Sequence, residues 1–214
     1  MENKKIVDTP GQRKIHMHDT PSMGGIPMFL GAVFALVIWL PGHAANEYKY
    51  LFGALILTFV IGLRDDLIPL RPIYKLLSQL IPAAIVIYLS DIHLVSFYDI
   101  GNIHFPIWIS WLLTLFVIVV ITNSINLIDG LDGLAGSVSF ISLSALGGWF
   151  FLADYYFLGY IIFAFLGGIL SFLIYNWQPS KIFMGDTGAL LLGFLLSCMI
   201  ILFINKNHAL AMDS

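Results

Sequence analysis

The sequence predicts an all-α fold, a polytopic bundle of transmembrane helices. Of its 214 residues, 59% are hydrophobic and 11% are charged, whereas a soluble domain carries roughly 25% charged residues. The mean hydropathy is +0.90, and repeated apolar stretches approach the roughly 20 residues needed to cross a bilayer. These stretches are continuous rather than alternating, which favours helices over a closed β-barrel.

Seven apolar stretches are candidate membrane spans: about 26–41, 48–63, 73–90, 105–122, 134–152, 156–175 and 187–204. Proline and glycine separate several of them: Pro41-Gly42 ends the first, and Pro179 breaks the chain before the last. The lead of residues 1–25 is polar and shows no signal peptide. There is no internal repeat or linker, so we expect residues 1–214 to form one integral-membrane domain, a cytoplasmic lead followed by about seven spans.

The cations are distributed unevenly between the two sides of this predicted bundle. Eight of the ten Lys and Arg residues fall in the lead or in the loops at 63–75, 122–134 and 175–187, and two fall on the opposite side. The first group is Lys4, Lys5, Arg13, Lys14, Arg64, Arg71, Lys75 and Lys181, and the second is Lys49 and Lys206. The positive-inside rule places the first side in the cytoplasm. The same side collects nearly every acidic and amide cluster, which predicts one cytoplasmic active site.

The central polar segment runs from Asn123 to Gly133, between two apolar stretches. Asn126, Asp129 and Asp132 are spaced three apart, so on a helical turn neighbouring members share a face. In an irregular turn, the glycines would instead let the backbone approach a ligand. Either arrangement offers hard oxygen ligands and amide donors, which suit Mg²⁺ and a phosphorylated substrate. The plain alternative is an Asn/Asp/Gly turn that joins two helices.

Two further acidic motifs fall on the same side. Asp65 and Asp66 end the second span, where their mutual repulsion requires a divalent cation or nearby Arg64 and Lys75 to offset it. In the stretch FMGDTG before the last span, Asp186 has two readings. It is either a carboxylate favoured by a helix N-terminus or part of a phosphate- or metal-binding turn. A solvated loop is the alternative for the Asp65-Asp66 pair.

The polar lead contributes cations and a glycine pair. Arg13, Lys14, His16 and His18 precede Gly24-Gly25, which directly adjoins the first span. These groups form either a cradle for phosphate or simple positive-inside anchoring of the chain.

Together, Gly-Gly, Asp-Asp, NxxDGxDGL and FxGDxG resemble the polyprenyl-phosphate N-acetylhexosamine-1-phosphate transferases, glycosyl transferase family 4. These enzymes transfer a sugar 1-phosphate from a UDP-sugar to a polyprenyl phosphate and release UMP. The stretch RPIYKLLSQ, residues 71–79, looks closer to the undecaprenyl-phosphate GlcNAc-1-phosphate branch than to the phospho-MurNAc-pentapeptide branch of peptidoglycan synthesis. The resemblance implies an enzyme of the inner (cytoplasmic) membrane whose active site faces the cytoplasm.

The resemblance also implies site roles. The implied catalytic residues are Asp65, Asp66, Asp129 and Asp132, with Asp65 as the acceptor of the lipid phosphate's proton. The implied metal ligands are Asp186 and Asp129, for Mg²⁺ or alternatively Mn²⁺. The implied substrate-binding residues are Asn126, Lys75, Lys14, His16, Gly24, Gly25 and Asn123. The implied partners are undecaprenyl phosphate, a UDP-N-acetylhexosamine and the lipid bilayer, without nucleic acid, and a homodimer is compatible with the family.

Members of that family usually carry one more span before the lead and two after the seventh, with a His-x-His-His loop between the last two. We therefore expect this chain to be a truncated or shortened member. The family's chemistry has been argued as direct in-line attack and as a route through an aspartyl-phosphate, and both stay open. A cation-coupled transporter and an inactive lipid-binding remnant are the alternatives from other functional classes.

Overall fold

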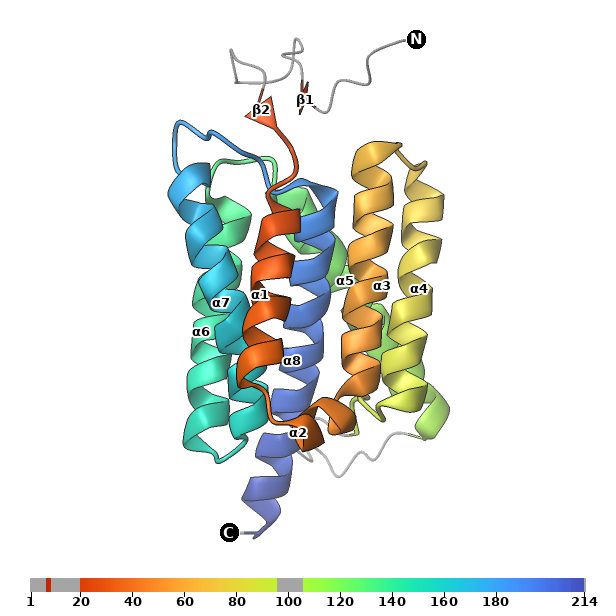
Figure 1. The fold of residues 1–214 in the computed structure, drawn as a ribbon. Helices are drawn as coiled ribbons and strands as arrows, with labels where there is room; N and C mark the ends of the chain where they lie inside the picture. Colours follow the sequence, from red (N-terminus) through yellow and green to blue (C-terminus); the bar gives the residue numbers. More distant parts are fainter. Residues whose placement is uncertain (1–6, 9–19, 96–105, 214) are drawn as a thin grey trace.

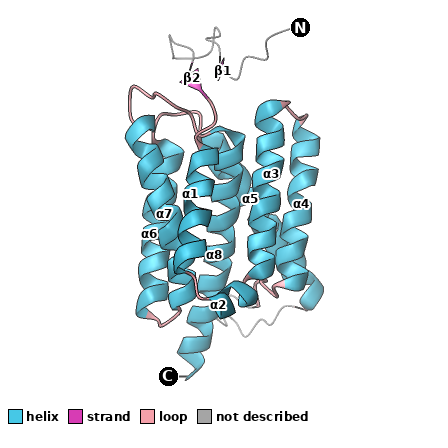
Figure 2. Cartoon of the chain, viewed as in Figure 1, coloured by secondary structure: helices cyan, strands magenta, loops and turns pink. Residues whose placement is uncertain are grey.

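A computed structural model describes residues 7–8, 20–95 and 106–213. The helices of this part are α1 (Gly25–Trp39), α2 (Gly42–Glu47), α3 (Lys49–Leu67), α4 (Pro72–Leu89), α5 (Ile107–Ile128), α6 (Leu134–Leu152), α7 (Tyr156–Asn176) and α8 (Gly185–Asp213). Two short strands, β1 (Val7–Asp8) and β2 (Thr20–Pro21), pair antiparallel near the start of α1. Figure 2 shows that helices make up nearly all of the chain that is described.

The predicted fold class is confirmed: each of the seven predicted spans corresponds to one helix, and α2 is a short additional helix between α1 and α3. The predicted ends were too early in two places. Helix α5 continues past residue 122 to Ile128 and includes Asn123, whose side chain donates to the Val119 carbonyl at 2.7 Å. Helix α8 continues past residue 204, where the Asn205 side chain donates to the His93 carbonyl at 2.7 Å.

Membrane insertion follows from helix length and composition. In the described part of the chain, five helices are long and apolar enough to cross a bilayer, namely α4, α5, α6, α7 and α8 as far as Asn207. Helix α1 is shorter but equally apolar, and α3 carries Arg64, Asp65 and Asp66 in its last turn. Large apolar side chains point outward from the bundle, including Val37 at 77% and Ile174 at 70% exposure. Such outward faces are expected of a protein whose surroundings are lipid.

Helix α8 forms the centre of the bundle, and α1, α3, α5 and α6 pack against it (Figure 1). In the 18-residue apolar stretch that identifies it as a candidate span, 83% of the residues are buried inside the molecule. A helix that is apolar on every side suits either lipid or the interior of a protein, and here the other helices surround most of α8. The residues at its N-terminus are therefore held by packing along the whole helix.

Close approach at the start of α8 depends on a glycine in α3. A Cβ added at Gly62 would lie 2.5 Å from the Thr187 Cα and 2.8 Å from the Asp186 carbonyl oxygen. Both are backbone atoms, so α3 would have to move away from α8. At Gly53, on the same helix, an added Cβ meets nothing within 4 Å.

We expect Gly62→Ala to lower the free energy of unfolding by about 1–3 kcal/mol, the usual cost of overpacking. Gly53→Ala is the matched control and should leave stability almost unchanged. Thermal unfolding in detergent, followed by circular dichroism, measures both. Equal stability of the two variants would contradict the close contact between α3 and α8.

The connections gather the polar motifs at one end of the bundle. The start of α1, the α3–α4 turn, the α5–α6 turn and the α7–α8 loop all lie at the upper end in Figure 1. The short helix α2, the α6–α7 turn and the end of α8 lie at the opposite end. The arrangement agrees with the sidedness that the cations predicted, because the described members of the larger cation group lie in the upper loops or the helix turns beside them.

Candidate functional site

Four acidic side chains from three distant segments meet at the upper end. Asp65 and Asp66 lie in the last turn of α3, Asp129 follows α5 directly, and Asp186 is the second residue of α8. Lys75, in the first turn of α4, reaches into the same cluster. The structure therefore brings together the carboxylates that the sequence placed on one side.

Asp186, at the start of α8, is contacted by side chains from α4 and α5. Its Oδ1 accepts a hydrogen bond from the Lys75 ammonium and another from the Asn126 side-chain amide, 2.6 Å away. The side chain of Asp186 is 31% exposed, so it remains accessible to a ligand. Charge-assisted contacts of this kind fix the orientation of a carboxylate. Lys75 and Asn126 thus position Asp186 from two sides.

Asp65 is neutralised within the protein. Its Oδ2 lies 3.0 Å from the Lys75 ammonium, and its Oδ1 accepts the Leu70 backbone N–H at 2.6 Å. The side chain is only 4% exposed. Because a buried charge needs a partner, Asp65 and Lys75 depend on each other. The proposed role of Asp65 as a proton acceptor stays a prediction.

Asp66 holds the start of α8. Its Oδ1 accepts the Asp186 N–H at 2.7 Å, and its Oδ2 accepts the Thr187 N–H at 2.9 Å and the Thr187 hydroxyl. The first N–H groups of a helix have no partner within the helix, and a negative charge there is favoured by the helix dipole. Asp66 therefore acts as a cap supplied by a different helix. Neither adjacent carboxylate is paired with Arg64, whose guanidinium donates to the Ile68 carbonyl at 2.6 Å.

Asp129 experiences the excess negative charge of the cluster. Burial and, to a smaller extent, the negative charges of Asp186 and Asp66 together raise the pKa of its carboxyl to about 8, although a hydrogen bond from the Gly185 backbone N–H opposes the shift. A carboxyl with such a pKa favours an added positive charge, since a nearby cation stabilises the ionised form.

The cluster fits a divalent cation held by few protein ligands. Among the described residues, no group of three or more His, Cys, Asp or Glu side chains forms a ready-made metal cage. Asp65 is buried beside Lys75, and both oxygens of Asp66 accept hydrogen bonds from the start of α8. Asp186 also contacts Lys75 and Asn126, but only through Oδ1, and its side chain is 31% exposed, so Asp186 and Asp129 are the better placed donors. Mg²⁺ is commonly bound through one or two carboxylates, with water and phosphate oxygens completing its shell.

Asn123 lies one helical turn below Asn126 and pairs with a residue that the sequence analysis did not single out. Its side-chain amide donates to the Gln79 Oε1 at 2.8 Å, and the Gln79 amide donates back at 3.4 Å. Gln79 is only 2% exposed. The amide pair joins α4 to α5 directly below Lys75 and Asn126. The sequence could have indicated Gln79, because a glutamine inside an apolar span needs a polar partner at membrane depth.

Asp132 takes part in a neighbouring loop network. Its Oδ2 accepts the Ser180 N–H at 3.3 Å, so it contacts the α7–α8 loop. Of the two arrangements predicted for this segment, the structure has the irregular turn, because α5 ends at Ile128 and Gly133 has a left-handed φ of 73°. Asp132 and Asp129 therefore do not share a helix face, and the catalytic role of Asp132 stays a prediction.

Asn176 joins the two loops of this network. Its Oδ1 accepts the Gly133 N–H at 2.8 Å, and its Nδ2 donates to the Ile182 carbonyl at 2.8 Å. The residue is 4% exposed. It is another buried polar residue at the end of an apolar span, and it fixes the α5–α6 turn relative to the start of α8.

We expect Asn176→Ala to lower the free energy of unfolding by about 2–3 kcal/mol, because the change leaves buried backbone groups without their partners. Ser171→Ala is the control on the same helix, since the Ser171 hydroxyl bonds the Gly167 carbonyl of its own helix at 2.8 Å. Thermal unfolding in detergent compares the two variants. A loss no larger than that of Ser171→Ala would show that the bridge does not stabilise the loops.

The glycine pair at the start of α1 serves close packing. The Gly24 N–H donates to the Phe183 carbonyl at 2.8 Å, and the Gly25 N–H donates to the Met184 carbonyl at 2.9 Å. A Cβ on Gly25 would lie 2.2 Å from the Gly188 backbone nitrogen. These amides are thus used within the protein, and substrate contact by Gly24 or Gly25 stays a prediction. Lys14 and His16 lie outside the described residues.

Known proteins resemble this chain over most of its length. The family model for glycosyl transferase family 4 matches residues 48–204. A probable undecaprenyl-phosphate N-acetylglucosaminyl 1-phosphate transferase of Bacillus subtilis (strain 168) is 35% identical over 211 residues, covering 95% of this chain and 57% of that protein. The phospho-N-acetylmuramoyl-pentapeptide-transferase of Thermotoga neapolitana is 40% identical over 183 residues, covering 81% of this chain and 57% of that protein.

The phospho-N-acetylmuramoyl-pentapeptide-transferase of Streptococcus pneumoniae (strain Taiwan19F-14) is 33% identical over 197 residues, covering 84% of this chain and 58% of that protein. The chain therefore spans somewhat more than half the length of these relatives. The matches confirm the resemblance found in the motifs. The chain belongs to glycosyl transferase family 4.

Proposed function

We propose that this protein transfers a sugar 1-phosphate from a UDP-sugar to undecaprenyl phosphate and releases UMP, with GlcNAc-1-phosphate as the transferred group. The observation that carries the proposal is the meeting of Asp129, Asp186, Lys75 and Asn126 at one end of a membrane bundle. The Bacillus subtilis relative, named for GlcNAc-1-phosphate transfer to undecaprenyl phosphate, supports the choice of sugar.

In the proposed reaction, an oxygen of the lipid phosphate attacks the β-phosphorus of the UDP-sugar. The bond between this phosphorus and the oxygen bridging to the α-phosphate breaks, and UMP leaves with the bonding electrons. The product is a lipid diphosphate that carries the sugar. Phosphoryl transfer of this type depends mainly on positioning and charge stabilisation.

The residues of the site have distinct tasks in this scheme. Asp129 and Asp186 would hold Mg²⁺, which, when bound, would offset phosphate charge and orient the diphosphate. Lys75 and Asn126 fix Asp186, and the Lys75 ammonium adds a positive charge beside the phosphates. Asp66 keeps the start of α8, and thus Asp186, in place. Because the site lies at the end rich in cations, we place it on the cytoplasmic face.

A second substrate, UDP-MurNAc-pentapeptide, is favoured by a different observation. The Thermotoga neapolitana relative, named for phospho-MurNAc-pentapeptide transfer, is 40% identical to this chain. Both substrates would use the same phosphates and release the same UMP. They differ only in the sugar and its attached peptide.

Release of UMP distinguishes the functions. We expect purified protein with Mg²⁺ and undecaprenyl phosphate to release UMP from UDP-GlcNAc, and to release less from UDP-MurNAc-pentapeptide. Omitting undecaprenyl phosphate is the control for simple hydrolysis. The Bacillus subtilis relative, assayed in parallel, shows whether the conditions support transfer. A reversed preference would assign the pentapeptide substrate, and no release from either would contradict the transferase proposal for this chain.

A further inference from the structure

A groove lies between α1 and α7, apart from the carboxylate cluster. It has a volume of about 430 Å³, and its walls include Pro27 and Met28 of α1 and Ser171 and Tyr175 of α7. Lys181, in the α7–α8 loop, lies at its end. The carboxylates come from α3, the end of α5 and α8, so the groove is built from different helices.

The groove follows a seam between two apolar helices. Its lining residues recur three or four positions apart on α7, from Gly168 through Ser171 to Tyr175. At Gly168 the helices touch, since an added Cβ would lie 2.7 Å from the Met28 carbonyl oxygen. Gly168 and Met28 both line the groove, and the other α7 residues that line it lie closer to the C-terminal end of that helix. The groove therefore occupies the part of the seam nearest the upper end, where an acyl chain can lie against apolar walls.

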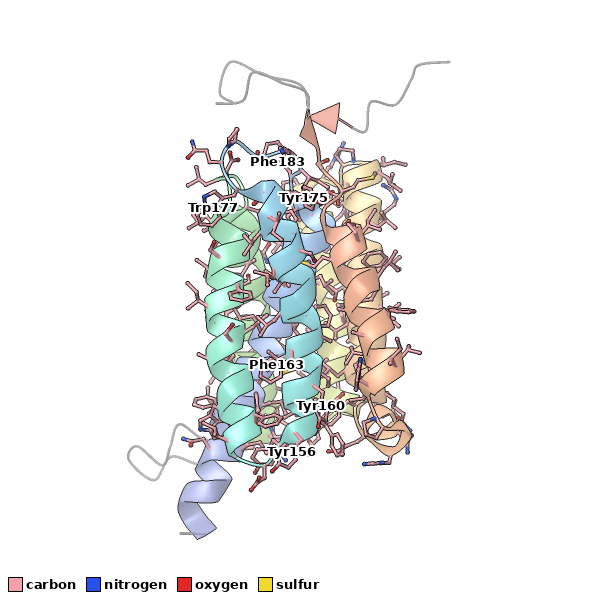
Figure 3. All side chains as sticks on the ribbon, turned by 60° about the vertical axis from the view of Figure 1, so that its left-hand side comes forward. Tyr156, Tyr160, Phe163, Tyr175, Trp177 and Phe183 are labelled. Carbon is pink, nitrogen blue, oxygen red and sulfur yellow. The ribbon has the colours of Figure 1, made fainter. Side chains whose placement is uncertain are left out.

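Aromatic residues indicate where the membrane surface crosses this seam. Figure 3 shows Tyr175 and Trp177 near the upper end of α7, and Tyr156 and Tyr160 near its lower end. Tyr175 is 57% exposed and Trp177 is 65% exposed. Tyr and Trp are enriched at the level of the lipid headgroups. The end of the groove marked by Tyr175 thus lies at headgroup depth.

Lys181 provides a positive charge at that depth. Its side chain is exposed, and it forms no ion pair with a carboxylate in the part of the chain that the structure describes. Its backbone N–H donates to the Tyr175 carbonyl at 2.8 Å, which holds the residue at the end of the groove. The groove therefore combines apolar walls with the cation of Lys181 at the membrane surface.

We propose that this groove binds one anionic phospholipid, with an acyl chain along α1 and α7 and the phosphate against Lys181. A neutral lipid would make no ion pair with Lys181, and a soluble phosphate compound would make no contact with the apolar walls. A cation near the membrane surface attracts an anionic headgroup. None of the groove's residues belongs to the carboxylate cluster, although Gly24, an expected substrate-binding residue, lies on its wall.

Native mass spectrometry of the protein in neutral detergent tests the proposal, with phosphatidylglycerol and phosphatidylcholine as the two probes. We expect the wild type to retain one phosphatidylglycerol and to bind phosphatidylcholine more weakly. Lys181→Gln should weaken phosphatidylglycerol binding about fivefold, the effect of removing one lipid–cation contact. Lys181→Arg should restore it. Lys206→Gln is the matched control, because Lys206 lies over the Tyr155 ring, away from the groove.

A second variant tests the groove itself. Ser171→Phe should fill the space between the helices and remove the bound phosphatidylglycerol while keeping Lys181. Circular dichroism and size-exclusion chromatography establish that each variant is folded. Equal retention by the wild type, Lys181→Gln and Ser171→Phe would overturn the proposal. Displacement of phosphatidylglycerol by one equivalent of undecaprenyl phosphate would also overturn it, because the groove would then be an acceptor site.

Discussion

Replacing Asp186 with Asn is expected to reduce Mg²⁺-dependent release of UMP by at least about a hundredfold, the usual loss when a charge-stabilising group is removed. Asn lacks the negative charge that Lys75 contacts and that a cation requires. The side chain keeps one oxygen that can accept the hydrogen bond from Asn126. Folding and membrane insertion should therefore persist while transfer is lost.

The control for Asp186→Asn is the same substitution at the opposite end of the bundle. Asp154 precedes α7 and contacts the Tyr156 hydroxyl, and its φ of 64° suits Asn as well as Asp. Asp154→Asn should retain full transfer. The substitution equivalent to Asp186→Asn in the Bacillus subtilis relative extends the test to a longer chain. Turnover like that of the wild type in both Asp186→Asn proteins would remove Asp186 from the mechanism.

Replacing Asp66 should act on stability first and on transfer as a consequence. Asp66→Ala removes the acceptor for three donors at the start of α8, and loss of a helix cap costs about 1–2 kcal/mol. Because Asp186 is one of the residues held, transfer should also fall. Asp66→Asn keeps one acceptor oxygen, so both losses should be smaller. Thermal unfolding and UMP release, measured on the same preparations, test these expectations.

The comparison of the two Asp66 variants separates positioning from chemistry. If Asp66 positions α8, the loss of transfer follows the loss of stability through the series from wild type to Asn to Ala. If Asp66→Asn keeps normal stability but transfers no better than Asp66→Ala, the charge of Asp66 acts on the substrate or the cation. The second outcome would contradict the capping role assigned here.

The spans could be predicted because hydropathy decides them. Every apolar stretch forms a helix, and the cations identify the end at which the polar motifs meet. The ends of the helices were less predictable. Asn123 and Asn126 look like residues of a turn, but both lie within α5, where their side chains bond Gln79 and Asp186 on other helices.

The division of tasks between neighbouring acidic residues could not be predicted. Asp65 and Asp66 are adjacent in the chain, so their repulsion predicted a divalent cation or nearby Arg64 and Lys75 as the compensating charge, and Lys75 does contact Asp65. On a helix, adjacent residues point in directions about 100° apart, and each finds a separate partner. Asp65 contacts Lys75, and Asp66 contacts the start of α8. These partners come from distant segments, so only the packing of α3 against α4 and α8 reveals them.

The most direct test of the site is binding of a single divalent cation beside the phosphates. Mn²⁺ replaces Mg²⁺ as the probe, and electron paramagnetic resonance follows its binding to the protein with UDP-GlcNAc present. We predict one Mn²⁺ per chain, with coupling to the phosphorus nuclei of the nucleotide, and loss of this signal in Asp129→Asn and in Asp186→Asn. Unchanged Mn²⁺ binding and phosphorus coupling in both variants would contradict a site built on Asp129 and Asp186.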